Sequence, residues 1–123
     1  MSILVVEDDE RSGRMLADLL RDDGFTVEVC ASGPSGAERL ARSPAPDVLV
    51  TDLRMPQVDG IAVARLARSR SPAMPILLIT AYPELAQRLA DCAAPSPTVF
   101  TKPINYPALV ETLSAIQGES RAM

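Results

Sequence analysis

Short apolar runs alternate with amphipathic segments along the 123 residues of the chain. Five runs stand out, the last weaker than the others, at residues 3–6, 27–30, 48–50, 76–79 and 98–101. Runs of this length and aliphatic character are typical of strands buried on both faces, as in a parallel sheet. The pattern therefore predicts five parallel strands.

Segments with helical spacing lie between the predicted strands, because their apolar residues recur three and four positions apart. Residues 83–92 are helical by propensity, with Pro83 in the first turn, where proline is tolerated. Gly24 fits a helix stop, and Asn105 fits an N-cap. The apolar stripes are Met15, Leu16, Leu19 and Leu20; Ala37, Leu40 and Ala41; Val63, Leu66 and Ala67; and Leu109, Leu113 and Ile116.

The alternation of strands and helices decides the fold class. It implies right-handed crossovers and a parallel sheet covered on both faces, so the sequence predicts an α/β fold of five βα repeats. A chain of 123 residues suffices for one compact domain with a single core. We place this domain at residues 1–118 and expect a frayed polar C-terminal tail at residues 119–123.

Charge and composition exclude several classes of function. The 12 basic and 16 acidic residues give a net charge of −4 with no basic stretch, which argues against direct binding of nucleic acid. Histidine is absent, so Ser-His-Asp catalysis and histidine zinc sites are excluded. Cys30 and Cys92 fit no metal spacing and are too few for a disulfide framework; Cys30, which ends an apolar run, is predicted to be a buried thiol.

The N-terminal residues carry no targeting signal. No basic region precedes the first apolar run, and that run is too short for a signal sequence or a membrane span. We therefore expect a cytoplasmic protein with no membrane partner.

Polar residues gather where the predicted strands end. In an open α/β sheet, ligands bind beyond the carboxyl ends of the strands, at the point where the strand order reverses. This edge therefore receives several acids, one hydroxyl group and one ammonium group. The residues in question are Glu7, Asp8, Asp9, Asp52, Thr80 and Lys102.

Each of these residues also has an ordinary structural explanation. The acids at residues 7–9 could cap a helix, Asp52 could start a turn, and Lys102 could be a solvated charge. Together they favour phosphoryl chemistry. Crowded carboxylates need a cation, and Mg²⁺ prefers carboxylates and phosphate oxygens. An ionised Asp52 could then attack phosphorus to form an acyl phosphate, whose oxygens would contact Thr80 and Lys102.

Four stretches, in order and each at a predicted strand end, resemble the receiver domain of bacterial response regulators over almost the whole chain. They are Ile3-Leu4-Val5-Val6-Glu7-Asp8-Asp9, Thr51-Asp52-Leu53-Arg54-Met55-Pro56 with Asp59-Gly60, Ile79-Thr80-Ala81, and Thr101-Lys102-Pro103. The resemblance implies a flavodoxin-like sandwich whose sheet has the order 2-1-3-4-5. It also implies a cis peptide between Lys102 and Pro103.

The resemblance also implies a role for each site residue. Asp52 would be the phosphoacceptor, Thr80 the switch hydroxyl, and Lys102 the lysine that pairs with the acceptor and then with phosphate. Mg²⁺ would be held by Glu7, Asp8, Asp52 and the backbone carbonyl of Arg54. The phosphoryl donor would be a phosphohistidine on a histidine kinase or a phosphotransfer protein, which must be a separate partner because this chain has no histidine.

Two features depart from the family pattern. The family usually has an aromatic residue three positions before the lysine, and this chain has Val99 there; Phe100 should face the other side of the sheet. Residues 93–97 replace the usual Gly-Ala turn with a proline-containing loop. In addition, Arg54 and Tyr82 could flank the phosphoacceptor and slow loss of the phosphoryl group, or they could be exposed side chains without kinetic effect.

Several functions remain open. The first is a phosphorylation switch, a relay or part of a longer regulator, which signals to a protein through the face of the fourth helix, fifth strand and fifth helix. It would not be an enzyme, beyond phosphorylating itself and slowly losing the group. The second is a receiver-like binding module whose output does not depend on phosphorylation.

Two further functions would require features in addition to this site. A phosphohydrolase would need a second acid and a substrate pocket. A flavin or nucleotide binder would need a Gly-rich loop after the first strand.

Overall fold

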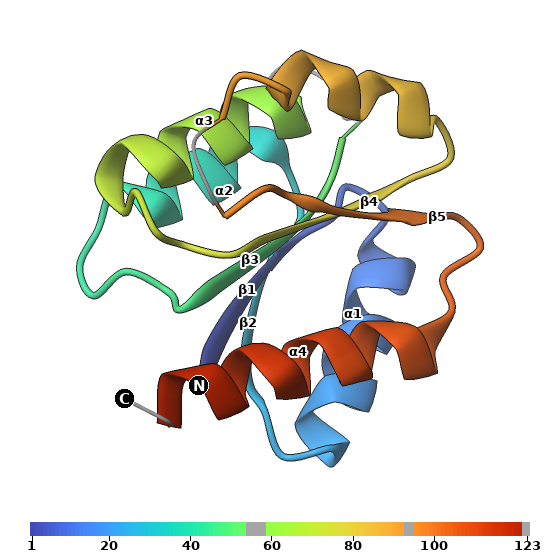
Figure 1. Cartoon of the computed structure of the whole chain (residues 1–123). Coiled ribbons are helices and arrows are strands. Elements are labelled where there is room, and N and C mark those ends of the chain that lie inside the picture. Colours follow the sequence, from blue (N-terminus) through green and yellow to red (C-terminus); the bar gives the residue numbers. More distant parts are fainter. Residues whose placement is uncertain (54–58, 93–94, 122–123) are drawn as a thin grey trace.

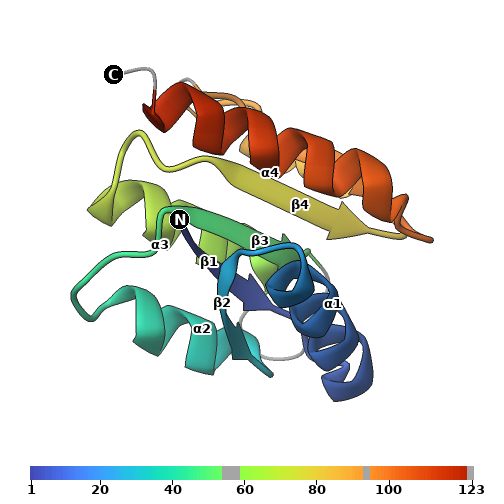
Figure 2. The same cartoon turned by 90° about the horizontal axis from the view of Figure 1, so that it is seen from below.

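Five parallel strands form one sheet with the order β2-β1-β3-β4-β5, as the resemblance implied. The computed structural model describes residues 1–53, 59–92 and 95–121, with side chains as far as residue 118. Figure 2 shows β3 between β1 and β4, near the middle of the sheet. The strands are β1 (Ser2–Val6), β2 (Thr26–Cys30), β3 (Val48–Asp52), β4 (Ile76–Thr80) and β5 (Thr98–Thr101).

Helices cover both faces of the sheet, so the chain has the flavodoxin-like three-layer architecture (Figure 1). Helices α1 and α4 pack on one face, and α2, α3 and the 3₁₀ helix η1 pack on the other. None of the helices in the described part of the chain combines the length and the apolar character that a membrane span requires. The helices are α1 (Glu10–Asp22), α2 (Gly33–Leu40), α3 (Gly60–Arg70), η1 (Pro83–Leu89) and α4 (Tyr106–Arg121).

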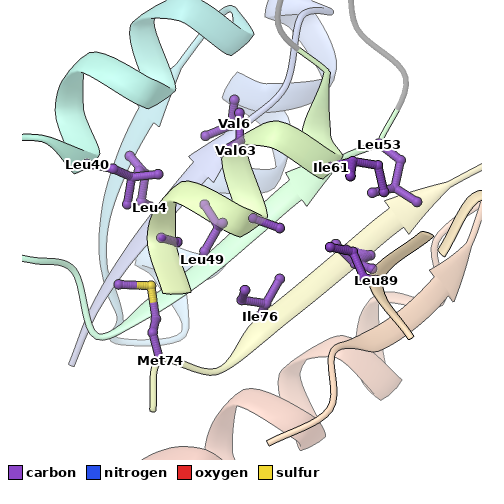
Figure 3. Close-up of a cluster of buried hydrophobic side chains, with 13 residues drawn as sticks. Leu4, Val6, Leu40, Leu49, Leu53, Ile61, Val63, Met74, Ile76 and Leu89 are labelled. Atoms are coloured by element: carbon purple, nitrogen blue, oxygen red, sulfur yellow. The ribbon is translucent and has the colours of Figure 1, made fainter. Parts of the chain in front are cut away.

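Two apolar layers hold the helices on the sheet. Alternate residues of each buried strand point to opposite faces, so that Leu4 and Leu49 belong to one layer and Ile3 and Val50 to the other. Figure 3 shows the first layer, to which the sheet contributes Leu49 and Ile76 and α3 contributes Ile61 and Val63. The strands that carry the polar edge are therefore fixed by packing on both faces.

Side-chain caps set where the helices begin and end. The Asp9 carboxylate accepts hydrogen bonds from the backbone N–H groups of Arg11 and Ser12, so α1 starts directly after the acids that follow β1. Gly24 ends the turn after α1 with a φ of 94°, a conformation that other residues rarely adopt. Asn105 accepts a hydrogen bond from the Ala108 N–H at the start of α4. Both Gly24 and Asn105 were predicted in these roles.

The structure corrects the predicted face of α1. Met15 and Leu19 are 61% and 41% exposed, although they belong to the predicted apolar stripe. The buried face consists of Gly13, Leu16, Ala17 and Leu20, because small residues at positions 13 and 17 let the helix lie close to the sheet.

Three other expectations also change. Residues 83–92 were predicted to be an α-helix, but η1 is a 3₁₀ helix that ends at Leu89 and begins without a side-chain cap, as is common for short connecting turns. The last helix continues to Arg121, past the predicted boundary at residue 118. The Cys30 side chain is half-buried and not fully buried.

Candidate functional site

Three carboxylates meet at the carboxyl edge of the central strands. Glu7 and Asp8 follow β1, and Asp52 ends β3, its neighbour in the sheet. A carboxylate oxygen from each lies within 4.8 Å of the other two. Glu7 and Asp52 are both 7% exposed, whereas Asp8 is exposed. The cluster thus combines two buried acids with one that faces solvent.

Lys102 is the cation that partly balances these acids. Its Nζ lies 2.8 Å from Oδ2 of Asp52 and 3.5 Å from Oε2 of Glu7. Partial burial opposes the charged form of Lys102, but the hydrogen bond to Asp52 and the charge of Glu7 outweigh it and raise the pKa. The ammonium group therefore stays protonated beside the acceptor carboxylate.

The pKa of Glu7 is raised, because Glu7 is buried beside a second acid. Burial, followed by the charge of Asp52, raises the pKa of Glu7 from 4.5 to about 7, although the Asp9 N–H and the charge of Lys102 act in the opposite direction. One ammonium group does not neutralise the cluster. A site of this kind favours a further cation.

The oxygen donors of the cluster fit a hard divalent cation. Mg²⁺ binds through one or two carboxylates and retains several waters. Glu7, Asp8 and Asp52 supply such oxygens, and the exposed Asp8 leaves room for water. The Arg54 carbonyl, which the resemblance implied as a further ligand, lies outside the described residues.

Asp9 has a different role from the two acids before it. Its carboxylate caps α1 at 3.1 Å from the Arg11 nitrogen and 3.2 Å from the Ser12 nitrogen. These backbone hydrogen bonds, that of Ser12 first, lower the pKa of Asp9. The capping explanation therefore holds for Asp9, while Glu7 and Asp8 join the cluster.

Thr80 is fully buried at the end of β4, and it directly follows Ile79, which is paired with Asp52 in the sheet. Its carbonyl accepts the Lys102 N–H at 2.8 Å, so β5 and its lysine are tied to β4. Its hydroxyl oxygen accepts the Tyr82 N–H at 2.9 Å. The structure also contains the cis peptide between Lys102 and Pro103.

Gly60 allows α3 to start against the acceptor strand. A Cβ atom at this position would lie 1.9 Å from the carbonyl oxygen of Asp52. The Gly60 N–H donates to the Leu53 carbonyl at 2.9 Å, and Asp59 caps the helix. The Asp59-Gly60 pair was part of the resemblance, but no sequence signal revealed this steric reason for the glycine.

A cavity of about 330 Å³ lies beside the charged cluster, and sequence reasoning did not find it. Glu7, Asp52 and Lys102 line one part of it, and Met15 and Ile104 belong to its apolar part. The sequence did not indicate this cavity, because Met15 was predicted to lie on the buried face of α1 and is in fact exposed.

The structure places one of the two departures from the family pattern. Val99 is 39% exposed, whereas Phe100 packs on the opposite face of the sheet with the residues of α1 and α4, as strand alternation predicted. Residues 93 and 94 of the loop before β5 lie outside the described residues. No described aromatic side chain therefore occupies the usual position beside Thr80 on β5.

Curated proteins match this chain in sequence. Response regulator MprA of Mycobacterium ulcerans is 36% identical over 114 residues, which are 93% of this chain and 49% of that protein. The probable transcriptional regulatory protein TcrX of Mycobacterium tuberculosis is 33% identical over 116 residues, which are 94% of this chain and 49% of that protein. The chain thus spans about half the length of the curated relatives it matches.

Solved structures of receiver proteins have a similar fold. A response regulator receiver protein from Sinorhizobium medicae is 32% identical, with a TM-score of 0.81 over 94% of this chain and 93% of that one. Chemotaxis response regulator CheY4 of Vibrio cholerae is 28% identical, with a TM-score of 0.80 over 94% of this chain and 97% of that one. The family model for the response regulator receiver domain matches residues 3–114. The chain therefore belongs to the response regulator receiver domain family.

Proposed function

We propose that Asp52 accepts a phosphoryl group from a phosphohistidine of a histidine kinase or a phosphotransfer protein. The observation that carries this proposal is the meeting of Glu7, Asp8 and Lys102 around a nearly buried Asp52. A carboxylate that lies in hydrogen-bond contact with an ammonium group is a competent nucleophile and needs no base.

The transfer proceeds by displacement at phosphorus. A carboxylate oxygen of Asp52 forms a bond to phosphorus, and the bond from phosphorus to the imidazole nitrogen of the donor breaks, so the imidazole leaves with the electron pair. Lys102 then pairs with a phosphoryl oxygen, and the Thr80 hydroxyl donates to another. When bound by Glu7, Asp8 and Asp52, Mg²⁺ would neutralise phosphoryl charge.

The output is a change of surface and not a released product. Contacts of the phosphoryl group with Thr80 and Lys102 would bias the equilibrium between two arrangements of the loops that follow β4 and β5. A protein partner would bind the face of η1, β5 and α4 in the cytoplasm. The chain would thus phosphorylate itself from a donor and lose the group slowly, without acting as an enzyme on other substrates.

A second candidate is a receiver-like binding module whose partner affinity does not depend on phosphorylation. The exposed Val99 favours it, because the usual aromatic residue is missing from this strand position. In this case Asp52 could still accept phosphate, but the partner would bind both forms equally.

Labelling with acetyl phosphate tests the proposal. The parent chain should gain one phosphoryl mass in the presence of Mg²⁺, and chelation of the metal or Asp52→Asn should abolish the gain. Asp18→Asn is the matched control, because Asp18 is a mainly exposed α1 residue that pairs with Arg21 at 3.6 Å. Labelling of Asp52→Asn at the parent rate would refute the assignment. Equal partner affinity of both forms would favour the second candidate.

A further inference from the structure

We propose that Tyr82 takes the part of the missing aromatic residue: phosphorylation moves its ring from the surface into a cavity between η1 and the start of α3. This inference rests on the proposed function, because it describes how Thr80 passes on the state of Asp52. It concerns a residue on the β4 side of the site, outside the strand that usually carries the aromatic.

The first observation is the direct link between Thr80 and Tyr82. The buried Thr80 hydroxyl oxygen accepts the Tyr82 N–H at 2.9 Å. A hydroxyl group can accept one hydrogen bond while it donates another. Thr80 can therefore donate to a phosphoryl oxygen on Asp52 and still hold Tyr82. Any movement of the hydroxyl toward β3 then draws the backbone of Tyr82 in the same direction.

The second observation is a cavity of about 380 Å³ that Tyr82 itself lines. Leu53, Ile61 and Leu85 form its apolar part. Leu53 directly follows the acceptor Asp52, so the cavity lies on the side toward which Thr80 would move. Its charged rim consists of Asp59, Glu84 and Arg88, with Arg88 Nη1 at 3.5 Å from Oδ2 of Asp59.

The third observation is the position of the ring in the described state. Tyr82 is 43% exposed, so much of its apolar surface remains to be buried. An aromatic ring gains from burial against aliphatic side chains, and its hydroxyl group can remain at a polar rim. The cavity offers both environments, and its apolar wall includes Leu85 from the first turn of η1.

Two other residues near Thr80 cannot serve as the aromatic side chain that moves on phosphorylation. Val99 is β-branched and therefore stiff, and it has no ring to move between two environments. Phe100 packs on the face of the sheet that carries α1 and α4, away from the face of Thr80. Among the described residues on the η1 side, Tyr82 combines exposure, an aromatic ring and a hydrogen bond to the Thr80 hydroxyl.

Tyrosine fluorescence can test the movement, because the sequence has two tyrosines and no tryptophan. In a Tyr106→Phe background, Tyr82 is the only tyrosine, and a neutral quencher such as acrylamide reports the exposure of its ring. Phosphorylation by acetyl phosphate and Mg²⁺ should lower the quenching constant about twofold, since a buried ring is shielded from the quencher. The phosphorylated fraction is measured in the same sample by intact mass.

Substitutions at position 80 separate the hydroxyl from the shape of the side chain. Thr80→Ser keeps the hydroxyl and should retain the protection per phosphorylated molecule, whereas Thr80→Val keeps the shape and should lose it. As a second measurement, the parent chain labelled with 3-fluorotyrosine should show a shift of the Tyr82 ¹⁹F resonance on phosphorylation.

The outcomes distinguish this inference from the function on which it rests. Absence of a phosphoryl mass on Asp52 would overturn both. A phosphorylated chain with unchanged quenching and an unshifted Tyr82 resonance would overturn the movement of Tyr82 alone. Equal protection in Thr80→Val and the parent would also overturn it, because the hydroxyl would then not be the link.

Discussion

The Lys102 ammonium group donates a hydrogen bond to Oδ2 of Asp52 at 2.8 Å; Asp52 ends β3, Lys102 directly follows β5, and β4 lies between these two strands. This contact holds together a site whose other members are mostly anionic. Several consequences can be measured.

Substitution of the lysine should strengthen metal binding while it weakens the chain. In Lys102→Gln, Glu7 and Asp52 face each other without a cation, so the free energy of unfolding without Mg²⁺ should fall by about 2 kcal/mol. Affinity for Mg²⁺ should rise, because the metal no longer competes with an ammonium group for the carboxylates. Urea unfolding with and without Mg²⁺ measures both effects. Unchanged Mg²⁺ affinity would contradict the competition.

The titration of Lys102 can be followed directly, because it is the only lysine in the sequence. After reductive methylation with ¹³C, its NMR signal should titrate above the pKa of a methylated lysine in a short peptide. Asp52→Asn should lower that pKa. The stability gained from the raised pKa is present at neutral pH and is lost only as the pH rises through the folded-state value. A parent pKa at or below the peptide value would show that the ion pair does not form in solution.

Glu7 should make the metal-free chain less stable as the pH rises. Its folded-state pKa of about 7 exceeds the ordinary 4.5, so between these values the folded chain binds more protons than the unfolded chain. Stability is therefore lost across this window, by at most about 3 kcal/mol from this group. Urea unfolding at several pH values measures the loss, and Glu7→Gln should reduce it.

Binding of Mg²⁺ tests whether the Glu7 carboxyl group is partly protonated near pH 7. Because metal binding requires the anion, adding Mg²⁺ near pH 7 should release protons from the parent chain and fewer from Glu7→Gln. Calorimetry in buffers of different ionisation enthalpy counts these protons. Identical release from both chains would exclude Glu7 as their source.

Gly60 should tolerate no side chain. A Cβ atom there would meet the Asp52 carbonyl oxygen at 1.9 Å, so Gly60→Ala should lower the free energy of unfolding by about 3 kcal/mol and reduce labelling of Asp52. Gly118→Ala is the control: nothing lies within 4 Å of a Cβ there, and alanine in a helix should add about 0.5–1 kcal/mol. Unfolding of both variants in urea gives the comparison. A neutral Gly60→Ala would mean that α3 can move away from the acceptor strand.

Local sequence patterns were sufficient for the strands and for the edge that carries the site. Aliphatic runs predicted five strands. The central strands β1, β3 and β4 are buried on both faces as expected, whereas the edge strands β2 and β5 are partly exposed. The positions of Glu7, Asp52 and Lys102 followed from the rule that the carboxyl ends of parallel strands share one edge. The predicted stop at Gly24 is also local, since it depends on the φ angle of one residue.

Other features depended on which elements pack together. The exposure of Met15 could not be read from its spacing, because both Met15 and Leu16 fit a helical stripe and only the position of the sheet selects the buried one. The cavity beside Tyr82 likewise depends on tertiary packing, because residues of η1 and of α3 both line it.

The sequence alone determined the order of the elements, the polar edge and the chemical types at the candidate site, because these depend on periodicity and on residues adjacent in the chain. The tertiary structure decided that Asp9 caps α1, whereas Glu7 and Asp8 approach Asp52. It also decided that Lys102 lies 2.8 Å from Asp52 and that the Tyr82 N–H donates a hydrogen bond to the Thr80 hydroxyl. Distances between side chains of different strands depend on register and packing, which no local pattern encodes.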